Sequence, residues 1–176
     1  MLRDLATLVE DEMVARQLAT SDQLTGLANR RGFFDFASKS LALCKRLAIP
    51  ATVFMVQIDG FEAIGEQHGP RVCDDVERDM AAIIAMTFRT SDAVARLSRN
   101  TFCVFASKVN ENGCSVPLAR LAANAAAYNQ QSKRPFSLAY RVGTMIYDPT
   151  KHTSLRELVA AARGRLVIMH DMTSRQ

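Results

Sequence analysis

The sequence AVARLSRNTFCVFA, residues 93–106, carries the pattern that determines the fold. Two short runs rich in alanine, valine and phenylalanine, 93–97 and 102–106, lie on either side of the four residues SRNT. Serine and asparagine are common in turns, and short apolar runs separated by such residues are typical of paired strands. This stretch therefore predicts a β-hairpin.

The segments on both sides of the hairpin predict the rest of the core. Upstream, a run rich in Val, Ile and Phe over 51–58 predicts a buried strand, and apolar residues at helical spacing over 72–87 predict a helix. Downstream, we expect a helix around 118–125 and a strand over 137–147. The order is the βαββαβ arrangement of ferredoxin-like folds. We therefore expect an α+β, two-layer palm with a mostly antiparallel sheet and helices on one face.

Further helices are expected at both ends of this core. Helical stripes run over 33–44 and 155–169, and residues 2–19 combine an apolar stripe with charged residues on their other faces. We divide the chain into an N-terminal signalling or linker helix, 1–20, and a domain, 21–176. The stripe of the N-terminal helix needs a partner, and about two heptads form only a weak coiled coil, so we expect a weak homodimer.

The composition is that of an ordinary globular domain. The 176 residues are 48% hydrophobic, and 22 basic against 18 acidic residues give a net charge of +4. The basic residues are scattered and the aromatic residues form no ladder, so DNA is not expected as a partner. The four cysteines are far apart and are expected to be buried, reduced thiols. Because the longest apolar run is far shorter than a membrane span and no signal peptide is visible, we expect a cytoplasmic location.

The segment DQLTGLANRR, residues 22–31, resembles the opening signature of GGDEF domains, the diguanylate cyclase family. The family pattern is D-x-L-T-G-L-x-N-R-R, with Pro usual where Ala28 stands. The resemblance covers about residues 20–172 and implies the palm of nucleotide cyclases as the fold. Further matches follow in order and at family spacing: Ile58-Asp59-Gly60-Phe61, Gly69, Asp74, Arg89-Thr90-Ser91-Asp92, Arg96, Phe102 and Val142-Gly143.

The resemblance implies a homodimeric enzyme that uses two Mg²⁺ to condense two GTP into cyclic di-GMP and two pyrophosphates. Mg²⁺ prefers carboxylate oxygens, so this chemistry needs particular acids. Here the first Asp of the family's D-x-D pair is Gln57, the metal-binding acid of the G-G-D/E-E-F hairpin is Asn100, and the following Glu is Thr101. Ser98 and Arg99 replace glycines that let the nucleotide approach the backbone. We therefore expect no intact catalytic site and no metal site.

The nucleotide-binding positions that the resemblance implies are also altered. The family's guanine-binding Asn is Gly65, the Lys that meets the terminal phosphate is Glu62, and a later phosphate-binding Lys is His170. Asp59 and Asp74 remain as a nucleotide-binding remnant. We expect a catalytically impaired domain without a cofactor, in which Mg²⁺ would bind only if residual GTP binding persists. Residual diguanylate cyclase activity is the alternative.

One ligand site of the family is retained. Arg89-Thr90-Ser91-Asp92 matches the R-x-x-D motif that binds cyclic di-GMP, and Arg120 falls where a second arginine completes that site. Guanidinium groups suit phosphate, and a carboxylate accepts hydrogen bonds from guanine. We expect a regulatory module that binds cyclic di-GMP. Short motifs also arise by chance, so a local cap at Asp92, and a nucleotide-free protein-interaction or dimerisation module, are the alternatives.

The chain ends point to a larger signalling protein. Residues 2–9, LRDLATLV, resemble the closing helix of a GAF sensor domain, and an ordinary helical linker is the alternative. We expect an upstream sensor domain, and a downstream domain is left open. Near the other end, Arg163 stands where the family has Asp, and we expect Arg163 and Arg165 to pair with Glu157 or Asp171 rather than with a ligand.

Overall fold

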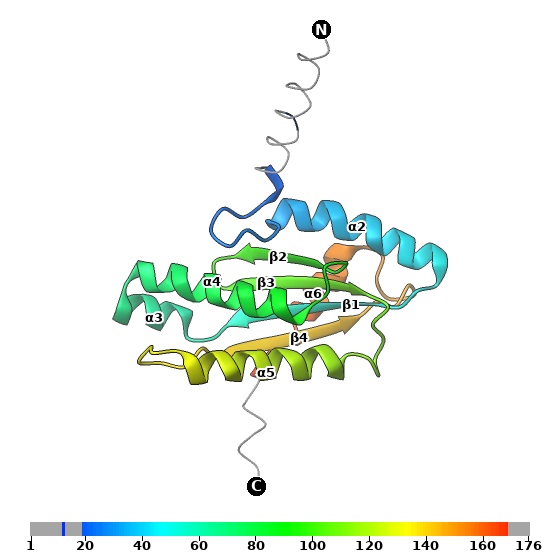
Figure 1. Ribbon diagram of the computed structural model, residues 1–176. Helices are drawn as coiled ribbons and strands as arrows, with labels where there is room; N and C mark the ends of the chain where they lie inside the picture. The colour runs from blue at the N-terminus through cyan, green and yellow to red at the C-terminus, as the bar shows by residue number, and fades with distance from the viewer. Residues whose placement is uncertain (1–11, 13–18, 169–176) are drawn as a thin grey trace.

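The computed structural model describes Glu12 and residues 19–168 (Figure 1). Almost all of the helix predicted over 2–19 lies outside the described residues. Among the described helices, none is both long and apolar enough to cross a membrane. The elements are α2 (Arg30–Leu47), β1 (Ala51–Ile58), α3 (Phe61–His68), α4 (Pro70–Thr87), β2 (Ala93–Ser98), β3 (Thr101–Ser107), α5 (Ser115–Gln131), β4 (Tyr140–Ile146), α6 (Leu155–Arg163) and β5 (Val167–Ile168).

The strands form one antiparallel sheet in the order β2-β3-β1-β4-β5. The predicted hairpin is confirmed, with a register shift between Arg96 and Ser98 where β2 approaches the turn. β1 lies between β3 and β4, and its Val53 pairs with Phe105 on one side and Met145 on the other. The predicted α+β class and the order of strands and helices are therefore confirmed, with β5 added at one edge.

Helices cover both faces of the sheet. Phe54 and Val56 of β1 pack into a core with α3, α4 and α5, whereas Val53 and Met55 pack into a second core with α2 and α6. In Figure 1, α4 and α5 lie in front of the sheet and α6 lies behind it. The prediction of helices on one face is therefore wrong. β1 is buried at every position except Gln57, so both of its faces need an apolar cover.

Several elements differ from the prediction, and α5, predicted around 118–125, extends further at both ends, over Ser115–Gln131. Helix α3 was not predicted because it is short and buries only Phe61 and Ile64, which is too little to show a helical period. The last helix was predicted to reach residue 169 but ends at Arg163, and Val167 instead pairs with Val142 of β4. The fourth strand was predicted from residue 137 but begins later, because the Asn129 side chain binds the backbone of the preceding segment.

An ionic network connects the DQLTGLANRR segment to β2 and α4. The Arg96 guanidinium contacts Asp22 Oδ2 at 2.8 Å and also pairs with Oε2 of Glu77. The Glu77 side chain is completely buried in α4, so it needs a cationic partner. Burial raises the pKa of Glu77, although the charges of Arg96 and Arg99 oppose this. The backbone N–H of Arg96 also donates to the carbonyl of Ala28 at 2.9 Å, so the segment is tied to the sheet edge twice.

Gly143→Ala should destabilise the fold strongly. An added Cβ at this buried position of β4 would lie 2.1 Å from the carbonyl oxygen of Ala162 and 3.1 Å from the carbonyl carbon of Arg165. Because these are backbone atoms, β4 and α6 would have to separate, which should lower the free energy of unfolding by about 3 kcal/mol. Urea unfolding measures the loss. Gly164→Ala is the control, because its Cβ would meet nothing closer than 3.6 Å, and equal stability of the two variants would contradict this packing.

Candidate functional site

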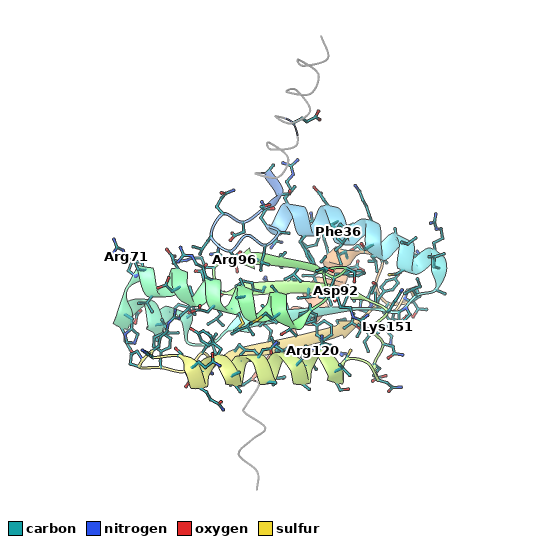
Figure 2. All side chains as sticks on the ribbon, in the orientation of Figure 1. Phe36, Arg71, Asp92, Arg96, Arg120 and Lys151 are labelled. Atoms are coloured by element: carbon teal, nitrogen blue, oxygen red, sulfur yellow. The ribbon has the colours of Figure 1, made fainter. Side chains whose placement is uncertain are left out.

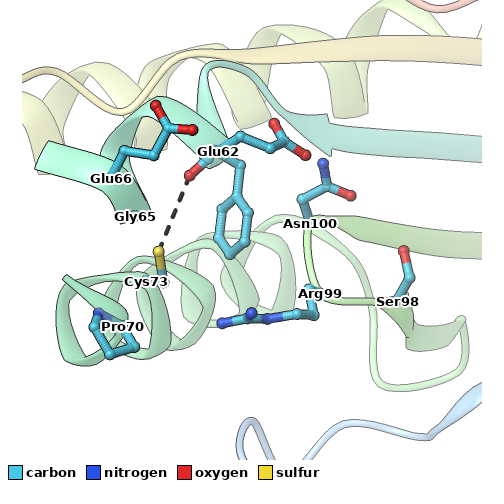
Figure 3. Close-up of a pocket in the computed structure, with 9 residues that line it drawn as sticks. Glu62, Gly65, Glu66, Pro70, Cys73, Ser98, Arg99 and Asn100 are labelled. Atoms are coloured by element: carbon cyan, nitrogen blue, oxygen red, sulfur yellow. Dashed lines mark hydrogen bonds between the residues drawn. The ribbon is translucent and has the colours of Figure 1, made fainter. Parts of the chain in front are cut away.

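The β2–β3 turn and helices α3 and α4 enclose a cavity of about 590 Å³ (Figure 3). The turn lies between two strands of the sheet, and α3 begins directly after β1, at Gly60 in the left-handed conformation (φ 63°). These connections place one end of the sheet next to the amino-terminal halves of both helices. The cavity is lined by Phe61, Glu62, Gly65, Glu66, Pro70, Cys73, Ser98, Arg99 and Asn100.

The side chain of Arg99 occupies part of this cavity. Figure 3 shows it extending from the turn along α4 towards Cys73 and Pro70. Its guanidinium carbon lies 5.6 Å from the centre of the Phe61 ring, and its Nε lies 3.5 Å from Oε1 of the buried Glu77. A cation over an aromatic face and next to a buried carboxylate is held by both. Arg99 is therefore held at the wall of the cavity, although its side chain is 64% exposed, at a position where the resemblance implies glycine.

The altered catalytic positions meet at the hairpin end of β1. Gln57 of β1 pairs in register with Thr101 of β3, which is buried. The Thr101 hydroxyl donates to Oδ1 of Asn100 at 3.0 Å, and the Asn100 carbonyl accepts from the N–H of Ile58 at 2.9 Å. The side chains at these three positions therefore offer two amide groups and a hydroxyl as metal ligands. They do not fit Mg²⁺, which prefers carboxylate oxygens. Within the described residues, no group of three or more His, Cys, Asp and Glu side chains could hold a metal ion.

The two retained acids do not line the cavity. Asp59 forms an ion pair with Arg141 of β4, with 2.6 Å between Oδ1 and Nη2. Asp74 lies on α4, half-buried, directly after the cavity residue Cys73. Glu62 and Glu66 supply the cavity with carboxylates on its α3 side. The cavity therefore carries carboxylates on its α3 side, and one of them, Glu62, stands where the resemblance implies a lysine.

The three residues of the predicted cyclic di-GMP site do come together. Arg89, Asp92 and Arg120 all line a second cavity, of about 210 Å³, between the start of β2, the end of β3 and α5. Figure 2 labels Asp92 beside β2 and Arg120 on α5. Arg120 donates to the carbonyl of Thr87 at 2.9 Å, which fixes its side chain against the end of α4. Arg89 precedes β2 and is exposed.

Asp92 also forms the local cap that was considered as its alternative role. Its Oδ2 accepts from the backbone N–H of Arg89 at 3.0 Å. This cap uses one of the two carboxylate oxygens, so it is compatible with a ligand contact at the other. Burial raises the pKa of Asp92, and the N–H and charge of Arg89 only partly oppose this.

Two residues that contribute to these cavities were not identified from the sequence. Lys108 lines the second cavity from the end of β3, so three cations surround one acid there. Its backbone is left-handed (φ 63°), and a lone lysine after a strand gives no signal in the sequence that it lines a cavity. Glu77 holds Arg99 in the first cavity. The sequence does contain one signal for this role, because Glu77 is a single acid among the apolar residues on the buried face of α4.

Comparison with known proteins agrees with this fold. A curated relative, the cyclic di-GMP phosphodiesterase NbdA of Pseudomonas aeruginosa, is 29% identical over 130 residues, which is 74% of this chain and 16% of NbdA. The diguanylate cyclase DosC of Escherichia coli is 28% identical over 101 residues, which is 57% of this chain and 22% of DosC. The chain therefore spans less than a quarter of the length of either relative.

Solved structures show the same palm. The coiled coil and GGDEF domain of DgcB from Caulobacter crescentus, in complex with c-di-GMP, superposes with a TM-score of 0.82 at 21% identity, covering 93% of this chain and 86% of that one. The GGDEF domain of FimX from Pseudomonas aeruginosa superposes with a TM-score of 0.72 at 18% identity, covering 83% and 90%. The family model described as diguanylate cyclase, GGDEF domain, matches residues 19–171, nearly the whole chain. The chain therefore belongs to the GGDEF family, as its DQLTGLANRR segment indicated.

Proposed function

We propose that this chain is a catalytically impaired GGDEF domain that acts as a regulatory module in cyclic di-GMP signalling and binds cyclic di-GMP at Arg89, Asp92 and Arg120. The observation that carries the proposal is the second cavity, which all three residues line. Both curated relatives reported above are named for making or degrading cyclic di-GMP, and the DgcB structure contains c-di-GMP.

The chemistry of the second cavity suits this ligand. Cyclic di-GMP carries two phosphates and two guanines, so it needs cationic forks and a hydrogen-bond acceptor. Arg89, Lys108 and Arg120 supply positive charge against the single carboxylate of Asp92. Guanidinium groups bind phosphate oxygens in pairs, and Oδ1 of Asp92 can accept from a guanine N–H. At about 210 Å³ the cavity holds part of such a ligand, so the remainder would extend into solvent or against a second copy.

The residues around the first cavity support the proposal that the chain does not synthesise cyclic di-GMP. Formation of a phosphodiester bond from GTP needs divalent cations beside the attacking and departing oxygens. The edge that would hold them presents Gln57, Asn100 and Thr101, and Arg99 fills space beside it. A domain of this kind supports signalling by binding rather than by catalysis. Residual cyclase activity, GTP binding supported by Asp59 and Asp74, and a role as a protein-interaction module are the competing functions.

The setting of the domain is also part of the proposal. We place it in the cytoplasm, behind an upstream sensor domain of the GAF type, as a weak homodimer joined through residues 2–19. The acidic and apolar composition of that segment supports a paired helix, since the segment has no core of its own.

The purified chain should form no measurable cyclic di-GMP from GTP and Mg²⁺. Loss of one preorganised charge-stabilising group commonly lowers a rate about 10²–10³-fold, and three of the required side chains are changed here. Chromatographic detection of product after long incubation tests this. An active cyclase assayed in parallel is the control, and product above background would establish the competing cyclase function.

Arg99→Gly combined with Glu62→Lys should restore GTP binding without restoring synthesis. The first change empties the space along α4, and the second replaces a repelling carboxylate with a cation. We expect GTP affinity to rise at least about tenfold, which corresponds to about 1.4 kcal/mol. Fluorescence titration with a labelled GTP analogue measures the change. The matched control is Arg71→Gly with Glu111→Lys, at exposed positions outside the cavity, and an equal gain there would show a nonspecific charge effect.

Arg89→Ala should weaken cyclic di-GMP binding at least about tenfold, because a fork to phosphate is lost. Asp92→Asn should also weaken it, although an amide oxygen can still cap the Arg89 N–H and so keep the local fold. Isothermal titration calorimetry measures both, with Arg71→Ala, at an exposed site on α4, as the control. Absence of heat from the unmodified chain at high ligand concentration would refute the proposed site and favour the interaction module.

A further inference from the structure

A cleft between α2 and α6 contains three arginines that neither the catalytic positions nor the cyclic di-GMP site uses. Arg30, at the start of α2, and Arg156 and Arg163, on α6, line a cavity of about 130 Å³. This cleft belongs to the α2 and α6 side of the sheet, whereas both cavities described above adjoin the α3, α4 and α5 side. It is therefore a separate place on the molecule.

The ring of Phe34 organises two of these arginines. The guanidinium carbon of Arg156 lies 4.8 Å from the centre of this ring, and that of Arg30 lies 5.5 Å from it. Arginine that stacks on an aromatic ring keeps the N–H groups at its edge available for hydrogen bonds. The two forks are therefore positioned before any ligand arrives, which lowers the entropic cost of binding.

Among the residues that the structure describes, no acid lines the cavity of about 130 Å³, so the positive charge of its three arginines is not balanced there. Asp35 of α2 lies 4.0 Å from Arg31, and Glu157 of α6 accepts hydrogen bonds from the backbone and side chain of Thr153 at 2.7 and 2.9 Å. Glu157 therefore does not form the predicted pair with Arg163, and Asp171 lies outside the described residues. Within residues 19–168, no salt bridge holds Arg30, Arg156 or Arg163.

Another cavity, larger than the one lined by the three arginines, continues the cleft. It has a volume of about 390 Å³, shares Phe34 and Arg156 with the smaller one, and adds Asp35, Ser38 and Lys39. Arg156 thus stands between a small cavity with two further arginines and a larger one with a lysine. Because Asp35 lies beside Lys39 in the larger cavity, an anion fits best at the smaller one, which has three arginines and, in the described part of the chain, no acid.

We propose that the cleft between α2 and α6 binds a compact phosphorylated anion, with a phosphoryl group between Arg30, Arg156 and Arg163. The planar guanidinium fork matches two oxygens of a phosphoryl group, and three forks around about 130 Å³ suit one such group. The phosphoryl group can belong to a free small molecule or to a lipid headgroup.

Titration of the full chain with inorganic pyrophosphate tests the site. Isothermal titration calorimetry at low salt should detect binding, and Arg163→Ala should weaken it at least about tenfold. Arg156→Lys keeps the charge but loses the fork, so it should weaken binding by a smaller factor. Arg165→Ala is the matched control, because Arg165 follows α6 closely, is exposed and does not line either cavity. All three positions are exposed, so circular dichroism should show an unchanged fold.

A second arm distinguishes the two sources of the phosphoryl group. Vesicles of phosphatidylcholine and phosphatidylglycerol at four to one should sediment the chain if the ligand is a lipid headgroup, and should do so less for Arg163→Ala than for Arg165→Ala. Binding of pyrophosphate without sedimentation assigns the site to a free anion. The proposal is overturned if neither probe binds, or if Arg163→Ala and Arg165→Ala weaken binding equally, since equal loss indicates only general charge attraction.

Discussion

The guanidinium of Arg96 lies between two carboxylates from distant parts of the chain, and the packing at the β2 edge depends on it. Asp22 belongs to the segment before α2 and Glu77 to α4, while Arg96 itself is in β2. Removing one partner of a buried ion pair leaves an uncompensated charge and costs about 3–5 kcal/mol. Burial tends to raise the pKa of Asp22, but hydrogen bonds from Thr25 and the charge of Arg96 together lower it. Asp22 is therefore held in its charged form.

The same network reaches the altered hairpin. Glu77 accepts Arg96 at one oxygen and lies near Arg99 at the other, so a single buried acid serves both a structural arginine and the one that occupies the first cavity. Arg99 therefore does not only add bulk where the family has glycine. It also forms an ion pair with the buried carboxylate of Glu77. Within the described structure, Oε1 of Glu77 has no hydrogen bond in this fully buried place even with Arg99 present, so a change at position 99 alone would remove the cation that lies 3.5 Å from it.

Much of the fold could be predicted from the sequence because strong local patterns coincide with buried elements. The run over 51–58 became β1 with the same bounds, and the hairpin formed where SRNT interrupts two apolar runs. Short elements gave no such pattern. Helix α3 has only two buried side chains, and β5 exists only because Val167 and Ile168 meet the edge of β4, which is a tertiary contact. Helices α2 and α6 were predicted, but their position on the opposite face of the sheet from α4 and α5 was not, because helical spacing does not show which face of a sheet a helix covers.

The residues of the candidate sites could also be predicted only in part. The motif over 89–92 and the distant Arg120 could be named in advance, and they do line one cavity, but Lys108 could not, because its place depends on how β3 ends. Arg163 and Arg165 were expected to pair with Glu157 or Asp171. Glu157 instead accepts hydrogen bonds from Thr153 just before α6, and Asp171 lies outside the described residues, so nearness in the sequence did not identify the partner.

The central position of β1 has a consequence for the motions of the domain. Its amides hydrogen-bond to strands on both sides, and apolar cores cover both of its faces. Such amides exchange their hydrogens with solvent only when the whole domain opens, whereas weakly packed edges exchange through local opening. β5 is two residues long and exposed, and it pairs with β4 alone. Hydrogen exchange should therefore be slowest in β1 and fastest in β5, so the chain loosens first where it leaves the sheet towards its carboxyl end.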